Sequence, residues 1–129
     1  SLATVDDGGP WVADVMYIAD DDFTIYWLSS ASTRHSKAIL ASPRVAGTIT
    51  IKNAPSEDNL GVQFSGIASK IDDPRPDLSK KHRTRRGKPL PAEGEDIRER
   101  DESWYVIKPK IIELIYEPLF GFNKKKLEL

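Results

Sequence analysis

Short runs of β-forming residues, each ended by a turn signal, constrain the fold of this chain more than any other feature. Leu2–Val5 ends at Asp6-Asp7-Gly8-Gly9, and the alternating run Trp11–Ala19 ends at Asp20–Asp22. The aromatic and β-branched run Phe23–Leu28 follows. Such runs between turn residues are typical of antiparallel strands. We therefore expect these three runs to form a three-stranded meander.

The remaining β-type runs lie on either side of a charged segment, residues 72–102. Arg44–Ile51 and Leu60–Ile71 are expected strands, the second bent or bulged at its glycines. Ser103–Tyr116 suggests two short strands separated by Pro109. In the charged segment we expect a helix from about Pro76 to Arg86, followed by an exposed loop. The whole pattern predicts a single mainly β domain, an antiparallel barrel of six to seven strands with Greek-key-like order and a few short helices.

Composition excludes several classes of function. The 129 residues suffice for one core, and the formal net charge of −1 gives no general attraction to nucleic acids or anionic membranes. The absence of cysteine excludes disulfides and thiolate catalysis, and two histidines argue against a histidine-rich metal site. The triplet Asp20–Asp22 favours a hairpin turn over a calcium site. No apolar stretch approaches the roughly 18 residues of a membrane span, and no signal peptide is visible.

We therefore expect a cytoplasmic protein without a bound metal or a membrane partner. The chain begins directly on a strand-like run, so a segment upstream of this sequence is an open alternative.

The stretch Ser32–Ile49 combines a helix signal with groups that bind phosphate. Ser32 or Thr33 can cap a helix, and Pro43 prevents its continuation. The unpaired N–H groups at a helix N-terminus attract anions. Side chains that could add donors are Ser29, Ser30, Ser32, Thr33, Arg34 and either His35 or Lys37. An ordinary capped helix explains the same residues, and composition alone favours that simpler interpretation.

A basic block, Lys80–Lys88, could follow a nucleic-acid backbone. It has no interleaved aromatic residues for base stacking, and the acidic block Glu93–Glu102 can neutralise it. We therefore expect a solvated helix face and no nucleic-acid partner. Trp11, Trp27 and Trp104 are expected in the core or at an interface, and one of them could lie against a flat ligand.

Several motifs in residues 2–71 occur together in one known superfamily. They are the hairpin Leu2–Pro10, the hydroxyl residue Ser29 at a strand end, the turn Thr33-Arg34-His35, the close Ser42-Pro43-Arg44-Val45, and the later strand with Val62, Phe64 and Gly66. In this arrangement the chain resembles the pyridoxamine 5′-phosphate oxidase-like superfamily of FMN-binding split barrels. The tail, ending in GFNKKKLEL, is more weakly similar to small uncharacterised relatives that finish in a GFGKK-like segment.

The resemblance implies a split barrel that forms a homodimer, with FMN in a groove between the subunits. Ser29, Thr33 and Arg34 match phosphate-binding positions, while His35 stands where the family usually has Lys. Lys37 could then supply the missing charge. Another family phosphate contact, an Arg, is replaced here by Ala13. The resemblance implies that Val15 and Met16 lie along the isoalloxazine ring of the flavin. A Gln that contacts the ring in the true oxidases is replaced here by Gly61, and Gln63 could take its place.

The resemblance implies an FMN-dependent oxidoreductase acting on an unknown small substrate, with no catalytic residue identified. The true oxidases carry a Trp and an Arg–His segment after a motif that here reads Ile112–Leu114, and neither follows in this chain. Pyridoxamine phosphate is therefore not the expected substrate. Three alternatives stay open: a relative that uses deazaflavin F420 or haem, for which His35 and His82 are the available axial ligands; a non-catalytic flavin-binding or sensor protein; and a nucleic-acid binder.

Overall fold

The computed structural model describes residues 1–51 and 54–129. Over these residues it has eight strands in one antiparallel sheet, and three short helices. The strands are β1 (Leu2–Asp6), β2 (Gly9–Ala13), β3 (Tyr17–Ala19), β4 (Ile25–Ser30), β5 (Arg44–Thr50), β6 (Leu60–Ile71), β7 (Glu102–Tyr116) and β8 (Lys125–Glu128). The helices are α1 (Arg34–Ala41), α2 (Pro76–Arg85) and α3 (Glu117–Phe120). No helix in the described part of the chain is long and apolar enough to cross a membrane.

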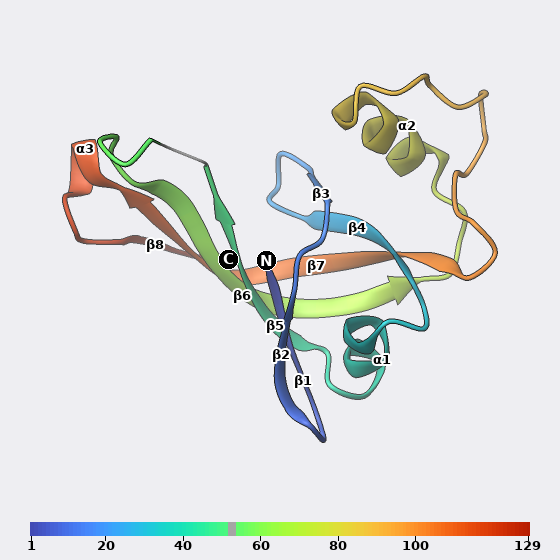
Figure 1. Cartoon of the computed structure of the whole chain (residues 1–129), viewed down its shortest axis with the longest axis horizontal. Helices are drawn as coiled ribbons and strands as arrows, with labels where there is room; N and C mark the ends of the chain where they lie inside the picture. Colours follow the sequence, from blue (N-terminus) through green and yellow to red (C-terminus); the bar gives the residue numbers. More distant parts are fainter. Residues whose placement is uncertain (52–53) are drawn as a thin grey trace.

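The order of the strands makes the sheet curve into a split barrel. The order is β2-β1-β5-β6-β7-β4-β3, and β8 pairs with the far end of β7. The outermost strands β2 and β3 are joined only by Asp14, Val15 and Met16, a link that reaches at most about 14 Å. The two edges of the sheet must therefore lie near each other, and the barrel is open along this seam (Figure 1).

This arrangement corrects the expected meander. Trp11–Ala19 is not one strand, because β2 pairs with β1 and β3 pairs with β4 at the opposite edge of the sheet. The alternating pattern of that run predicts extended backbone but does not identify the partner strand. The split of this run and the added strand β8 give eight strands, where the sequence suggested six to seven.

The core of the barrel lies on both faces of β4. Ile25 and Trp27 belong to one buried cluster, in which the Trp27 ring stacks on Tyr105 with centroids 5.2 Å apart. The alternate residues Tyr26 and Leu28 pack on a second cluster around Trp104. Buried residues of α1 join the first cluster and those of α2 join the second, and Figure 1 shows the two helices on opposite sides of β4 and β7. The helix expected from about Pro76 to Arg86 is thus confirmed as α2.

Two of the three tryptophans lie where the sequence suggested. Trp27 and Trp104 are fully buried. Trp11 is 43% exposed on β2 and carries the Arg34 guanidinium over its ring.

Pro109 does not break the last long run into two strands, contrary to the sequence-based expectation. β7 continues through Pro109, which lies opposite Gly66 where the register between β6 and β7 shifts. Proline lacks the N–H that a regular ladder needs, and a bulge removes that requirement. A side chain on Gly66 would collide with the Lys108 carbonyl, so the glycine allows the close approach.

Beyond the barrel, β5, β6 and β7 continue into a projecting sheet region. We call residues 48–51, 60–64 and 111–129 the arm. The tail, which the sequence did not place, folds here as α3 and then as β8, which pairs with Ile111–Leu114 of β7. Figure 1 shows this region extending away from both α1 and α2.

Candidate functional site: the N-terminus of α1 and the barrel seam

The N-terminus of α1 is built as its sequence predicted. Thr33 is the N-cap, and its Oγ1 accepts a hydrogen bond from the Ser36 backbone N–H at 3.3 Å. The first turn of the helix carries no acidic residue. The positive end of the helix dipole and its unpaired N–H groups are therefore not neutralised by the helix itself.

Two hydroxyl groups converge on His35 beside this helix end. His35 Nε2 lies 3.0 Å from Ser29 Oγ and 3.2 Å from Thr33 Oγ1. The imidazole is 9% exposed, and burial lowers its pKa below the usual value because the charged form loses hydration. His35 is thus neutral at pH 7 in the free chain, and a nearby anion would favour its protonation.

Arg34 points away from this cluster and binds Asp6 on the β1–β2 hairpin. Its Nε and Nη2 donate to the two Asp6 carboxylate oxygens at 2.7 and 2.8 Å. This pairing lowers the pKa of Asp6. The guanidinium lies 4.5 Å from the ring centroid of Trp11. One edge and one face of the guanidinium are therefore engaged, and its charge is balanced by the carboxylate. Lys37 lines an open groove with Arg34 and Asp6 on the same side of α1.

Val15 and Met16 lie in the link between the barrel edges. They precede β3, whose first residue, Tyr17, pairs with Trp27 of β4. Val15 is partly buried and packs against the core cluster that contains Trp27. Continuing the β3–β4 register by two residues would bring Val15 opposite Ser29.

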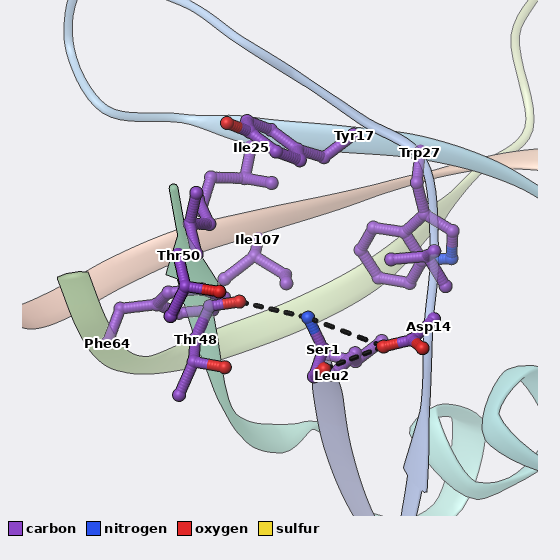
Figure 2. Close-up of a pocket in the computed structure, with 12 residues that line it drawn as sticks. Ser1, Leu2, Asp14, Tyr17, Ile25, Trp27, Thr48, Thr50, Phe64 and Ile107 are labelled. Atoms are coloured by element: carbon purple, nitrogen blue, oxygen red, sulfur yellow. Dashed lines mark hydrogen bonds and ion pairs between the residues drawn. The ribbon is translucent and has the colours of Figure 1, made fainter. Parts of the chain in front are cut away.

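Val15 also lines a cavity of about 230 Å³ at the open seam of the barrel. Figure 2 shows its side chains converging from β1, β3, β4, β5, β6 and β7. The apolar lining is Leu2, Val15, Ile25, Trp27, Ile49, Phe64 and Ile107, and the polar groups are those of Ser1, Asp14, Tyr17, Thr48 and Thr50. Among the described residues, the buried Trp27 Nε1 donor has no partner. No single run of the sequence identifies this cavity, because six strands contribute to it.

Gln63 is separated from the other predicted site residues. Its neighbour Phe64 is buried in the barrel core, so Gln63 points to the opposite face of β6. Ser29 shares the face of β4 that carries Trp27, a member of the same core cluster as Phe64. Gln63 Oε1 instead accepts a hydrogen bond from Lys124 Nζ at 2.5 Å. Neither this contact with the tail nor the Asp6–Arg34 pair could be predicted from the sequence, because each joins segments that are far apart along the chain.

The donor set at α1 suits a phosphate group better than a metal or a haem iron. It offers two hydroxyls, an imidazole that can gain a proton, and a helix N-terminus. No group of three or more potential metal ligands occurs in the described residues. His35 Nε2 faces two hydroxyls, and His82 lies on α2 with its ring against the edge of Trp104. The residues present therefore fit the phosphate end of a flavin nucleotide.

The comparisons with known proteins identify the family of the chain. A sequence model of the pyridoxamine 5′-phosphate oxidase family matches residues 1–115. The chain belongs to this family. A UPF0306 protein from Haemophilus ducreyi is 33% identical over 66 residues, which cover 50% of this chain and 44% of that protein. The chain thus spans less than half the length of this relative.

Solved structures of the superfamily share the fold. A conserved hypothetical protein from Mycobacterium tuberculosis superimposes with a TM-score of 0.78 at 18% identity, over 99% of this chain and 82% of its own. HutZ, a haem storage protein from Vibrio cholerae, gives 0.66 at 19% identity over 84% and 78% of the two chains. An F420 reductase gives 0.66 at 22% identity over 86% and 85%. The predicted superfamily and the split-barrel fold are therefore confirmed.

Proposed function

We propose that this member of the pyridoxamine 5′-phosphate oxidase family binds FMN and acts as an oxidoreductase on a small substrate. The observation that carries the proposal is the convergence of Ser29, Thr33 and His35 at the N-terminus of α1. FMN supplies hydride or electron transfer when bound. The chain's own task is to hold the phosphate, to support the ring and to admit the substrate.

At the phosphate end, the free chain offers mainly hydrogen-bond donors, and a positive charge develops on His35 when the phosphate binds. The Ser29 hydroxyl and the free N–H groups of α1 can donate to phosphate oxygens. The Thr33 hydroxyl, which donates to Ser30 O and Ser36 Oγ in the free chain, can turn its proton to a bound phosphate. His35 then gains a proton, because a bound phosphate offsets the burial that keeps the free imidazole neutral. Arg34 contributes less than the family pattern implies, since Asp6 already engages its fork.

At the ring end, the link Asp14–Met16 and the seam cavity form the remaining surface. Val15 lines the cavity, and continuing the β3–β4 register by two residues would bring it opposite Ser29 of the phosphate cluster, which supports this arrangement. A floor of aliphatic and aromatic side chains with a few hydroxyls favours a small, mostly apolar substrate.

A second copy of the chain completes the proposed site. Gln63 and the Thr33 cluster face opposite sides of the sheet, so a flavin that contacts both must lie between two copies. The arm offers a surface for the second copy, because its apolar side chains share one face and are only partly covered. They are Ile49, Leu60, Val62, Ile112, Leu114, Tyr116 and Leu127, which the strand register places side by side.

The test is the affinity for FMN compared with riboflavin, which lacks the phosphate. Replacing Thr33 and Arg34 together with Ala is expected to weaken FMN binding about 100-fold and riboflavin binding less than twofold. The matched control replaces Thr84 on α2 and Arg86, the C-cap residue of that helix, with Ala and is expected to change neither affinity. Equal losses for both ligands would place the phosphate elsewhere. A native protein that neither co-purifies with flavin nor retains added FMN, and instead shows a haem or F420 spectrum, would contradict the cofactor assignment.

A further inference from the structure

The C-terminal tail reaches back onto a residue of the proposed flavin site. Lys124 Nζ donates to Gln63 Oε1 at 2.5 Å and lies 3.5 Å from Glu113 Oε2. Gln63 and Glu113 are direct cross-strand partners on β6 and β7, so their side chains leave the same face of the sheet. Lys124 thus lies over a pair of neighbours, although it comes from a segment beyond the residues that match the family.

The contact with Lys124 determines which polar group of the Gln63 amide is free to bind a ligand. An ammonium group only donates hydrogen bonds, so it holds the amide oxygen of Gln63 and leaves the amide NH₂ turned away as a donor. The contact also places a positive charge next to that donor. Glu113 offsets part of this charge, and Lys126, the cross-strand neighbour of Glu113, is itself paired with Glu128 at 2.8 Å.

We propose that the tail is part of the flavin site, with Lys124 as the positioning residue that makes Gln63 a hydrogen-bond donor to the flavin ring and that sets the electrostatic potential there. This inference rests on the proposed FMN function. A flavin ring gains negative charge on reduction, so a nearby cation favours the reduced form. Lys124 therefore raises the reduction potential of the bound flavin, and Glu113 lowers it.

The experiment compares three variants of the full chain: Lys124→Met, Glu113→Gln and the control Lys80→Met. Lys80 is an exposed lysine on α2, outside the arm, so the control makes the same exchange away from the proposed flavin site and the surface for the second copy. The measurements are the dissociation constants of FMN and riboflavin, and the reduction potential of the bound flavin. Lys124→Met is expected to weaken both ligands equally, by about tenfold, and to shift the potential to a more negative value. Glu113→Gln is expected to shift it to a more positive value, and Lys80→Met to leave it unchanged.

The opposite shifts in reduction potential expected for Lys124→Met and Glu113→Gln distinguish this role from a purely structural one. If Lys124 only fastened the tail, Lys124→Met and Glu113→Gln would both loosen it, lower the melting temperature and leave the potential at the control value. That result, with a wild type that binds flavin, would overturn this inference alone. A wild type that binds no flavin would overturn the proposed function and this inference with it.

Discussion

The two halves of the long strands β6 and β7 follow the same apolar alternation but bury it differently. In the barrel half, Ala68 of β6 and Ile107 of β7 are each 1% exposed, in the core cluster that also contains Ile39 of α1. In the arm half, Val62 and Leu114 lie on the corresponding face and are only half-buried. Hydrophobic pattern therefore predicts that a strand face is to be covered, but not whether this chain or another copy covers it.

The prediction with the largest expected effect tests this difference in burial with two substitutions on β6. Ala68→Asp in the barrel is expected to abolish folding, since burying an unpaired carboxylate costs several kcal/mol. Val62→Asp in the arm, on the same face of β6, is expected to cost the single chain about 1 kcal/mol or less and to separate the proposed dimer, with loss of flavin. Circular dichroism and analytical ultracentrifugation measure folding and assembly. A Val62→Asp protein that remains a dimer with bound flavin would show that the second copy does not cover the arm.

The next prediction concerns the pH dependence of FMN affinity, which involves only the His35 site in the barrel. Because His35 is neutral in the free chain and gains a proton beside phosphate, FMN affinity is expected to fall as pH rises from about 6.5 to 8.5. His35→Lys supplies a fixed charge, so it should tighten FMN binding about tenfold at pH 8.5 and remove the dependence.

The controls keep this test specific to the phosphate. His35→Gln is the neutral match and should bind FMN weakly at every pH in this range, while riboflavin affinity should not change with pH for any of the three proteins. Variants of the arm should retain the wild-type pH profile if they still bind flavin. A pH dependence that survives in His35→Gln would assign it to another group.

The sequence predicted those parts of the molecule that depend on local signals. Residue types predicted Ser32 or Thr33 as the N-cap and a bend or bulge at the glycines of Leu60–Ile71. The structure has Thr33 as the N-cap and a bulge at Gly66, while the register runs regularly through Gly61. Pro109 was misleading because its effect depends on the partner strand, which supplies a glycine opposite. The separation of Gln63 from Thr33, and the contacts Asp6–Arg34 and Gln63–Lys124, join segments far apart in sequence. The separation and the two contacts depend on how the sheet curves and on the pairing of the C-terminal tail with β7, which local sequence signals do not determine.

The smallest expected effect concerns stability, and it again separates the barrel from the arm, because the two histidines lie on α1 and α2, away from the arm (Figure 1). Burial lowers the pKa of His82, with Arg86, Arg83 and Lys88 lowering it further and Glu102 opposing them. Its Nδ1 is buried without a partner in the described structure, and its ring meets the edge of Trp104. The folded state therefore favours neutral His82, so stability is complete above the unfolded pKa of about 6.5 and decreases as pH falls below it.

His82→Phe keeps an aromatic ring against Trp104 and removes the group that must gain a proton. Between pH 7.5 and 5.5 the wild type is expected to lose stability, and the variant to lose about 0.5 kcal/mol less. Urea titrations followed by tryptophan fluorescence measure the difference. A substitution in the arm that involves no histidine, such as Leu119→Ala, should leave the acid-dependent loss of stability the same as in the wild type. If His82→Phe loses as much stability as the wild type, then α2 is not held by a neutral His82, and the acid sensitivity of the barrel rests on His35 of α1.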